Sequence, residues 1–298
     1  MQPDCQKIRH RIYGLEYLGS TQLNAPPSGR VRNYVIHDDQ NWVDELSTTF
    51  KEVLQDIKGG KPISVISISI SYHMSIIGTD YHQLTQLPEY QELVSQVSEL
   101  IDLGVPIVVS AGNAGQADRY PRDLSLFNSL THLNPAIIAV GSTGVREPDQ
   151  ASSFTSEGIV EDHTDMVNWG EGYDLFVAAD IEKGVDGTSF STPLTASLID
   201  SMKQINPNLT VEMVKAILKI SATDLAQSAP TVEGAGRVNP NIAIYFAYLS
   251  LGHHSREEKQ TYAETLDLDI PLEDLDWLYS RLSRQVFWRD TLKQNFGE

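Results

Sequence analysis

The sequence predicts an α/β fold with a mostly parallel central sheet. Short β-branched runs alternate with longer segments whose apolar residues recur at helical spacing. This alternation is typical of β-α-β units, in which a helix carries the chain back between neighbouring parallel strands. Hydrophobic residues make up 41% of the 298 residues, which is enough to build a substantial core.

The first predicted elements are a strand, a helix and a second strand. Residues 30–37 (RVRNYVIH) are typical of a strand, and residues 63–70 (ISVISISI) form a β-branched run suited to a buried strand. Residues 42–57 between them predict a helix that Gly59-Gly60 ends. The apolar face of this helix comprises Val43, Leu46, Phe50, Val53, Leu54 and Ile57.

The middle of the chain continues the alternation. Residues 89–103 predict an amphipathic helix that ends before Gly104, and residues 106–110 and 136–140 predict two further strands. The segment AGNAG (111–115) directly follows the strand at 106–110. Active sites of parallel sheets lie at the carboxyl ends of the strands, so we expect this segment at the catalytic edge.

The last part of the chain is predicted to be mostly helical. We expect helices over residues 193–205 and 209–221, the second with Thr210 as its N-cap, and a turn at 234–240. In the polar tail, Leu275, Leu278, Leu282 and Val286 share one helix face, which we expect to pack on the same domain. The predicted organisation is an N-terminal segment (1–29), a main domain (30–250) and a polar helical tail (251–298).

Charge and composition exclude several classes of partner. The formal net charge is −18, so we expect neither nucleic acid nor an anionic membrane surface as a partner. No apolar run has the length of a membrane span, and residues 1–14 lack the apolar block of a signal peptide. The single cysteine, Cys5, permits no intramolecular disulfide. These features slightly favour the cytoplasm as the location.

The stretch VDGTSFSTPLTASLI (185–199) places Ser189 in a turn that opens onto a helix. The free N–H groups and the dipole of a helix N-terminus favour a developing negative charge there. The N–H of Ser189 is therefore well placed to donate to an oxyanion. Pro193 fits the first helical turn, where its missing N–H costs little. By itself, a serine at a helix start is more often a cap than a nucleophile.

Asn113 is the second residue with catalytic character. It follows a predicted buried strand, and its side-chain amide is a neutral donor that can bind an oxyanion. The neighbours Gly112 and Gly115 allow a sharp turn and a close approach of substrate. Taken alone, the asparagine could equally serve the turn.

From about residue 30 to residue 246, the chain resembles the subtilisin-like serine proteases, or subtilases. GTSFSTP (187–193) resembles the nucleophile motif of the family, and VVSAGNAG (108–115) is similar to the segment that carries its oxyanion asparagine. SVISISIS (64–71) resembles the strand that pairs with bound substrate. PAIIAVGSTG (135–144) and SSFTSEG (152–158) resemble two further segments in the same order. The resemblance implies a three-layer subtilisin-like fold.

The resemblance also implies a serine endopeptidase mechanism acting on a peptide or protein substrate. Ser189 would attack the carbonyl, a histidine would accept its proton, and Asn113 with the Ser189 N–H would bind the oxyanion. The residues expected along the substrate are Ser69, Ile70, Ser71, Ser110, Ala111 and Gly112. We expect no cofactor; the family often binds calcium, but we assign no ligands and no metal site.

The aspartate and histidine motifs of the family are not recognisable. In the family both precede the strand that we place at 30–37, and only residues 1–29 are available there. His10, in HRIYG (10–14), is the candidate histidine, because this segment faintly resembles His-Val-Ala-Gly; Asp4 is too close to it to serve as the aspartate. An alternative combines Asp38 or Asp39 with His73 or His82, although that region already matches the substrate segment.

The first strand of the family fold is therefore missing or replaced. The chain could be a fragment of a longer protease, a degenerate relative whose N-terminal residues fill the gap, or a protein that receives the strand from a partner. We expect weak activity or none from this polypeptide alone. The alternative function is a pseudoprotease that binds peptides or proteins, and a hydrolase with another acyl substrate is a third hypothesis.

Overall fold

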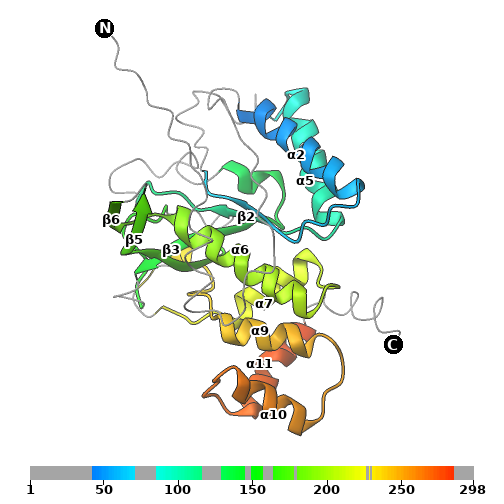
Figure 1. Ribbon diagram of the computed structural model, residues 1–298, viewed down its shortest axis with the longest axis vertical. Coiled ribbons are helices and arrows are strands. Elements are labelled where there is room, and N and C mark those ends of the chain that lie inside the picture. Colours follow the sequence, from blue (N-terminus) through cyan, green and yellow to red (C-terminus); the bar gives the residue numbers. More distant parts are fainter. Residues whose placement is uncertain are drawn as a thin grey trace.

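The computed structural model describes residues 42–70, 85–115, 129–144, 149–156, 164–177, 180–225, 228 and 230–284. Four strands form a parallel sheet in the order β1 (Ile66–Ile68), β2 (Ile107–Ser110), β3 (Ile138–Gly144) and β4 (Met166–Glu171). Helices cover both faces of this sheet (Figure 1). The predicted α/β fold with a parallel sheet is confirmed. The strand expected at 30–37 lies outside the described residues.

One face of the sheet is covered by α2 (Trp42–Lys58) and α5 (Pro88–Asp102), which pack side by side (Figure 1). Both helices begin and end within one residue of the predicted bounds. Their apolar faces join the side chains of β1 and β2 in one buried cluster. Gly104 follows α5 with φ of 74°, a backbone conformation that side-chain-bearing residues rarely adopt, which explains why a glycine ends this helix.

The other face is covered by α6 (Thr188–Ile205), with α7 (Val211–Ser221) and α9 (Pro240–Leu249) behind it. Helix α6 is central, because it contacts all four strands of the sheet as well as α9. Thr210 is the predicted N-cap of α7, and its side chain accepts a hydrogen bond from the Met213 N–H at 3.2 Å. The prediction of this helix and of its cap is confirmed.

Two expectations about element bounds were wrong. The run 63–70 forms a ladder over Ile66–Ile68 alone, because its partner β2 is short and begins after Pro106, which has no N–H to donate. Helix α6 begins at Thr188 rather than 193, so Pro193 lies inside the helix and not in its first turn. The helix extends past Pro193, and the Ser189 carbonyl, which would otherwise accept the N–H of residue 193, accepts the hydroxyl of Ser69 instead.

The run ISVISISI has two faces with different functions. Ile66, Ile68 and Ile70 pack into the cluster beneath α2 and α5, whereas Val65 faces the opposite core and Ser69 reaches α6. This is the period of two expected for a strand. The small serines on the second face let the start of α6 approach the sheet closely.

Two further strands were not predicted. β5 (Tyr173–Val177) and β6 (Asp180–Val185) form a separate antiparallel pair. β4 was missed as well, because its sequence MVNWGE neither alternates regularly between apolar and polar residues nor forms a continuous apolar run. It is nevertheless buried, since it lies between β3 and the segment around Arg237.

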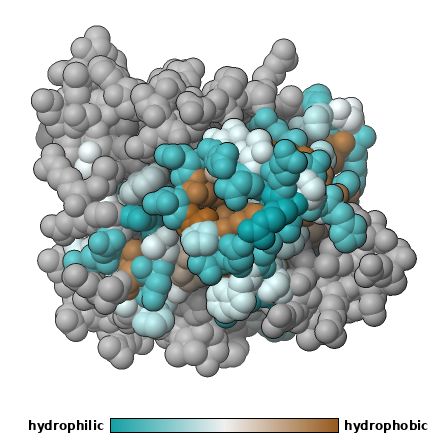
Figure 2. All heavy atoms as spheres, turned by 90° about the horizontal axis from the view of Figure 1, so that it is seen from below, coloured by the Kyte–Doolittle hydropathy of each residue, from teal (hydrophilic) through white to brown (hydrophobic). Residues whose placement is uncertain are grey.

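The tail folds into α10 (Arg256–Thr265) and α11 (Leu272–Arg284), as the sequence predicted in outline. Leu275 and Leu282 are fully buried in the same core as α7 and α9, and Leu278 packs against it; Val286 lies outside the described residues. Seen from this end, hydrophilic side chains surround a smaller hydrophobic area (Figure 2). None of the described helices is long and apolar enough to cross a membrane.

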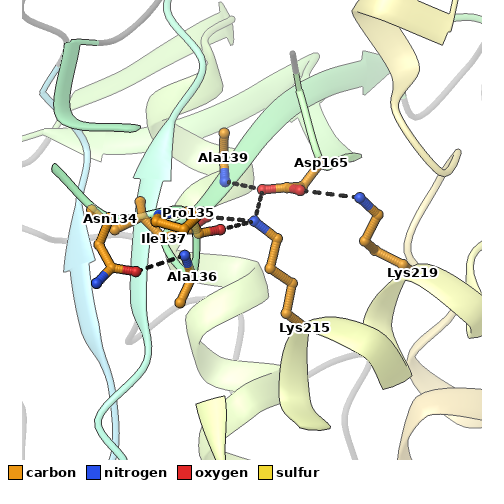
Figure 3. Close-up of polar contacts among 8 residues, drawn as sticks. All are labelled: Asn134, Pro135, Ala136, Ile137, Ala139, Asp165, Lys215 and Lys219. Carbon is orange, nitrogen blue, oxygen red and sulfur yellow. Dashed lines mark hydrogen bonds and ion pairs between the residues drawn. The ribbon is translucent and has the colours of Figure 1, made fainter. Parts of the chain in front are cut away.

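A buried carboxylate joins the sheet to α7 (Figure 3). It lies where β3 and β4 begin, whereas Ser189 lies beside the carboxyl end of β1. Asp165, which precedes β4, pairs with Lys215 at 2.8 Å and Lys219 at 3.3 Å and accepts the Ala139 N–H at 3.0 Å. Lys215 also donates to the carbonyls of Pro135 and Ile137, each at 2.8 Å. These contacts fix the beginnings of β3 and β4 against one helix.

Replacing Asp165 tests the contribution of this cluster. Asp165→Asn keeps the acceptor for Ala139 but leaves two lysines without their counter-ion, so we expect the free energy of unfolding to fall by about 3 kcal/mol. Urea denaturation measures the change. Glu92→Gln is the control, because the Lys51–Glu92 pair is half exposed and its loss should cost under about 1 kcal/mol. Equal costs in the two variants would contradict the expectation.

Glu233 provides a test that depends on pH. Burial, and then the nearby Asp224, raise the pKa of Glu233 above its ordinary value of 4.5, although the Leu225 N–H donates to its carboxylate. The folded protein therefore holds this proton more tightly than the unfolded chain, and stability falls as the pH rises above 4.5. We expect Glu233→Gln to have a higher melting temperature than the unmodified protein at neutral pH, where Glu233 is charged. Below pH 4.5 the two proteins should melt at the same temperature, because Glu233 is then neutral as well. A benefit that is the same at both pH values would be inconsistent with this cause.

Candidate active site

Ser189 lies at the beginning of α6, beside the carboxyl end of β1. Its hydroxyl is half-buried and donates to the carbonyl of Ser69 at 3.2 Å. In return, the hydroxyl of Ser69 donates to the carbonyl of Ser189 at 3.0 Å. The first turn of α6 contains no acidic residue, so the positive end of the helix dipole is not neutralised within the helix.

Asn113 is held in place by Thr188, the residue before Ser189. The Oδ1 atom of Asn113 accepts the backbone N–H of Thr188 at 3.0 Å and its hydroxyl at 2.8 Å. Thr188 is fully buried, whereas Asn113 is exposed. Because Oδ1 is occupied in this way, the orientation of the amide is determined and its Nδ2 donors face away from Thr188.

Gly187 leaves room for two donors to meet. A Cβ atom on Gly187 would lie 3.4 Å from Nδ2 of Asn113 and 3.7 Å from the backbone nitrogen of Ser189. Both nitrogens therefore border the same small space, which is open because residue 187 has no side chain. N–H groups of the first helical turn have no partner within their own helix. This arrangement of two donors suits an anionic oxygen.

The loop that carries Asn113 is fixed by the segment at 151–156. The carbonyl of Gly112 accepts the Ser156 N–H at 3.0 Å, and the N–H of Gly115 donates to Phe154 at 2.9 Å. The Ser156 hydroxyl accepts the Ala114 N–H at 3.1 Å. Gly112 has φ of 108°, so the turn requires a glycine. These bonds explain why two distant segments of the sequence are both needed at this site.

The end of β4 supports the other side of the site. Gly187 donates its N–H to the Gly170 carbonyl at 2.7 Å, and Nδ2 of Asn168 donates to the Thr195 hydroxyl of α6 at 3.0 Å. A Cβ on Gly170 would lie 2.5 Å from the Ser142 hydroxyl, so only glycine fits there. The sequence gives no signal for the contributions of Asn168 and Gly170, because both depend on the unpredicted strand β4.

The other predicted site residues are partly assembled around Ser189. Ser69 and Ile70 follow β1 and are partly buried, whereas Ser110 and Ala111 at the end of β2 are fully buried. Gly112 lies in the Asn113 loop. Ser71, His10, Asp4, Asp38, Asp39, His73 and His82 lie outside the described residues.

No base is assigned to Ser189 by the described part of the chain. The acceptor of its hydroxyl is a backbone carbonyl, not a histidine. His132 lies in the short helix η3 (Ser129–Leu133) ahead of β3, and His254 stacks on Tyr248 near the tail. Among the described ranges, we find no group of three or more His, Cys, Asp or Glu side chains arranged to hold a metal ion.

Comparison with known proteins identifies the family. The model of the subtilase family (Peptidase_S8) matches residues 38–236, which is more than half of the chain. The chain belongs to the subtilase family. The match includes β1 to β6, α6 and α7, and it ends before α9.

Individual subtilases are more distant. The serine protease AprX of Bacillus subtilis (strain 168) is 26% identical to this chain over 212 residues. The match covers 62% of this chain and 43% of AprX, so the chain spans less than half the length of that relative. The self-cleaved protease domain of PatA superposes with a TM-score of 0.52 at 21% identity, covering 73% of this chain and 72% of that one. The prenylagaramide maturation protease PagA superposes with a TM-score of 0.51 at 17% sequence identity, and the match covers 72% of this chain and 70% of PagA. The solved structures support the fold.

The contact between Asn113 and Thr188 can be tested through stability. Asn113→Ala removes the acceptor of two hydrogen bonds, one of them to a buried hydroxyl, so we expect the free energy of unfolding to fall by about 1 kcal/mol. Asn208→Ala, at an exposed turn after α6, is the control and should change it by less than about 0.5 kcal/mol. If both substitutions leave urea denaturation unchanged, the side chain of Asn113 is not held as described.

Proposed function

We propose that this subtilase domain carries a serine endopeptidase site in which Ser189 is the nucleophile. The observation that supports this proposal is the shared space beside Gly187, which Nδ2 of Asn113 and the N–H of Ser189 both border. These donors would stabilise the oxyanion that forms when a carbonyl carbon is attacked next to them. The relative AprX is itself a serine protease.

The proposed reaction proceeds in two acyl-transfer steps. The Ser189 Oγ adds to the peptide carbonyl while a base takes its proton, and the oxyanion lies between the two donors. The same proton then passes to the leaving amine, the C–N bond breaks, and an acyl-enzyme remains. Water attacks the acyl group in the same way and regenerates the Ser189 hydroxyl.

The proposed reaction also requires a base that accepts the proton of the Ser189 hydroxyl. Within the described residues, the Ser189 hydroxyl donates a hydrogen bond to the Ser69 carbonyl. A base must therefore replace that carbonyl as the acceptor before the proton can be transferred. His10 is the candidate within this sequence, and a further segment of a longer protein or a partner chain are the other sources. Peptide substrate would lie along the backbone that follows β1, where Ser69 and Ile70 are only partly buried.

A second function is a peptide-binding pseudoprotease. It is favoured by two observations: the sequence has no recognisable Asp and His motifs, and the Ser189 hydroxyl is bonded to a carbonyl. Peptide would then bind at the same edge without cleavage. The two functions differ in whether Ser189 is chemically activated.

Labelling with a fluorophosphonate probe distinguishes these functions. The probe reacts with a serine that has a working base and an oxyanion hole. The protease function predicts labelling of the folded protein that disappears in Ser189→Ala and falls about 100- to 1,000-fold in Asn113→Ala, the usual loss when one oxyanion donor is removed. If the folded protein does not label, the isolated chain lacks a base and the pseudoprotease function is supported.

Gly187→Ala tests the oxyanion space directly. The new Cβ would make ordinary van der Waals contacts, with its closest neighbour at 3.4 Å, so we expect the melting temperature to change little. The methyl group would nevertheless occupy the space between the two donors. We expect labelling to fall by about 100-fold or more. A variant that folds and still labels at the original rate would show that the oxyanion lies elsewhere.

A further inference from the structure

The carbonyl of Ser189 has lost its normal partner within the helix. In an α-helix, a carbonyl accepts the N–H of the residue four positions later, and for Ser189 this residue is Pro193. Proline has no N–H, and its ring also crowds the carbonyl of the fourth residue before it. The carbonyl of the nucleophilic residue therefore requires a donor from another part of the chain.

Ser69 supplies that donor from the sheet. Its hydroxyl lies 3.0 Å from the Ser189 carbonyl, and its own carbonyl accepts the Ser189 hydroxyl at 3.2 Å. The two residues thus form a closed pair of hydrogen bonds between segments 120 residues apart in sequence. Each bond restricts one side-chain torsion and one backbone position.

Neighbouring hydroxyls of α6 do not fulfil this role. Ser191 and Thr192 both donate to the Thr188 carbonyl, at 2.9 and 2.8 Å, and Thr195 donates to Ser191 at 3.0 Å. These hydroxyls stabilise the helix itself, whereas that of Ser69 connects the helix to the strand.

Ser67 precedes Ser69 by two residues, but its buried hydroxyl has no hydrogen-bond partner within the described residues.

We infer that Ser69 is a positioning residue for the Ser189 nucleophile, and that its hydroxyl replaces the N–H that Pro193 lacks. This inference rests on the proposed function and adds to it a side-chain role for Ser69, besides the backbone role of this segment in binding peptide. The bond holds Ser189 at a constant distance from the end of β1. A displacement of the nucleophile by about 1 Å can cost about 100-fold in rate.

A double-mutant cycle on the full chain tests the inference. The rate of fluorophosphonate labelling is measured for Ser69→Ala, Pro193→Ala, the double variant and the unmodified protein. We expect Ser69→Ala to lower the maximal labelling rate at least about 10-fold, without changing the probe concentration that gives half the maximal rate. Pro193→Ala restores an N–H donor to the helix. In that background, we expect Ser69→Ala to lower the maximal labelling rate only about 2- to 3-fold relative to Pro193→Ala alone.

Two further variants serve as controls. Ser67→Ala removes a hydroxyl of the same strand that makes no described hydrogen bond, and it should label at the original rate. Ser69→Thr keeps the hydroxyl and should retain most of the rate that Ser69→Ala loses. The inference is overturned if Ser69→Ala labels normally, or if its loss is equally large with and without Pro193→Ala.

A chain that does not label leaves the inference testable. The proposed function would then fail for this polypeptide, and amide hydrogen exchange in the first two turns of α6 becomes the measurement. We expect Ser69→Ala to accelerate this exchange, Pro193→Ala to reverse the acceleration, and Ser67→Ala to have no effect. Unchanged exchange in Ser69→Ala would overturn the positioning role independently of any activity.

Discussion

The beginning of α6 has more hydrogen-bonding groups than its own helix can satisfy, and the site is organised around them. The N–H of Thr188 has no partner within the helix, and it donates to Asn113. The carbonyl of Ser189 is freed by Pro193, and it accepts from Ser69. The N–H of Gly187 donates to Gly170 at the end of β4. Each unsatisfied group is thus paired with a different segment at or just after the end of a strand, which brings those segments to one place.

The position of α6 makes this arrangement rigid. The helix contacts all four strands, and its apolar residues share a core with α7, α9 and α11. At the opposite edge of the sheet, Asp165 and two lysines hold the beginnings of β3 and β4 against α7. The site therefore lies at one end of a sheet whose other end is fixed by ion pairs. Such a support is what an oxyanion site requires, because its donors must be in place before charge develops.

The described part of the candidate site is compatible with both proposed functions. The two donors beside Gly187 would suit a peptide carbonyl oxygen whether or not a base is present. Only the fate of the Ser189 proton separates cleavage from binding. In the described residues that proton is shared with the Ser69 carbonyl, which is a poor base, so activation depends on a group that reaches Ser189 from elsewhere.

The sequence by itself determined the fold class and the helices α2, α5 and α7, and it singled out Ser189 and Asn113 as the candidate residues of the site. These features are local: helical spacing, capping residues and glycine-rich turns act within a few positions of one another. Only the tertiary structure decided which residues support the site. The sequence of β4 has no clear hydrophobic period, and α6 begins five residues before Pro193. The hydrogen bond from Ser69 to Ser189 joins residues 120 positions apart in the chain. Contacts of this kind depend on how strands and helices are placed in space, and no local pattern encodes that placement.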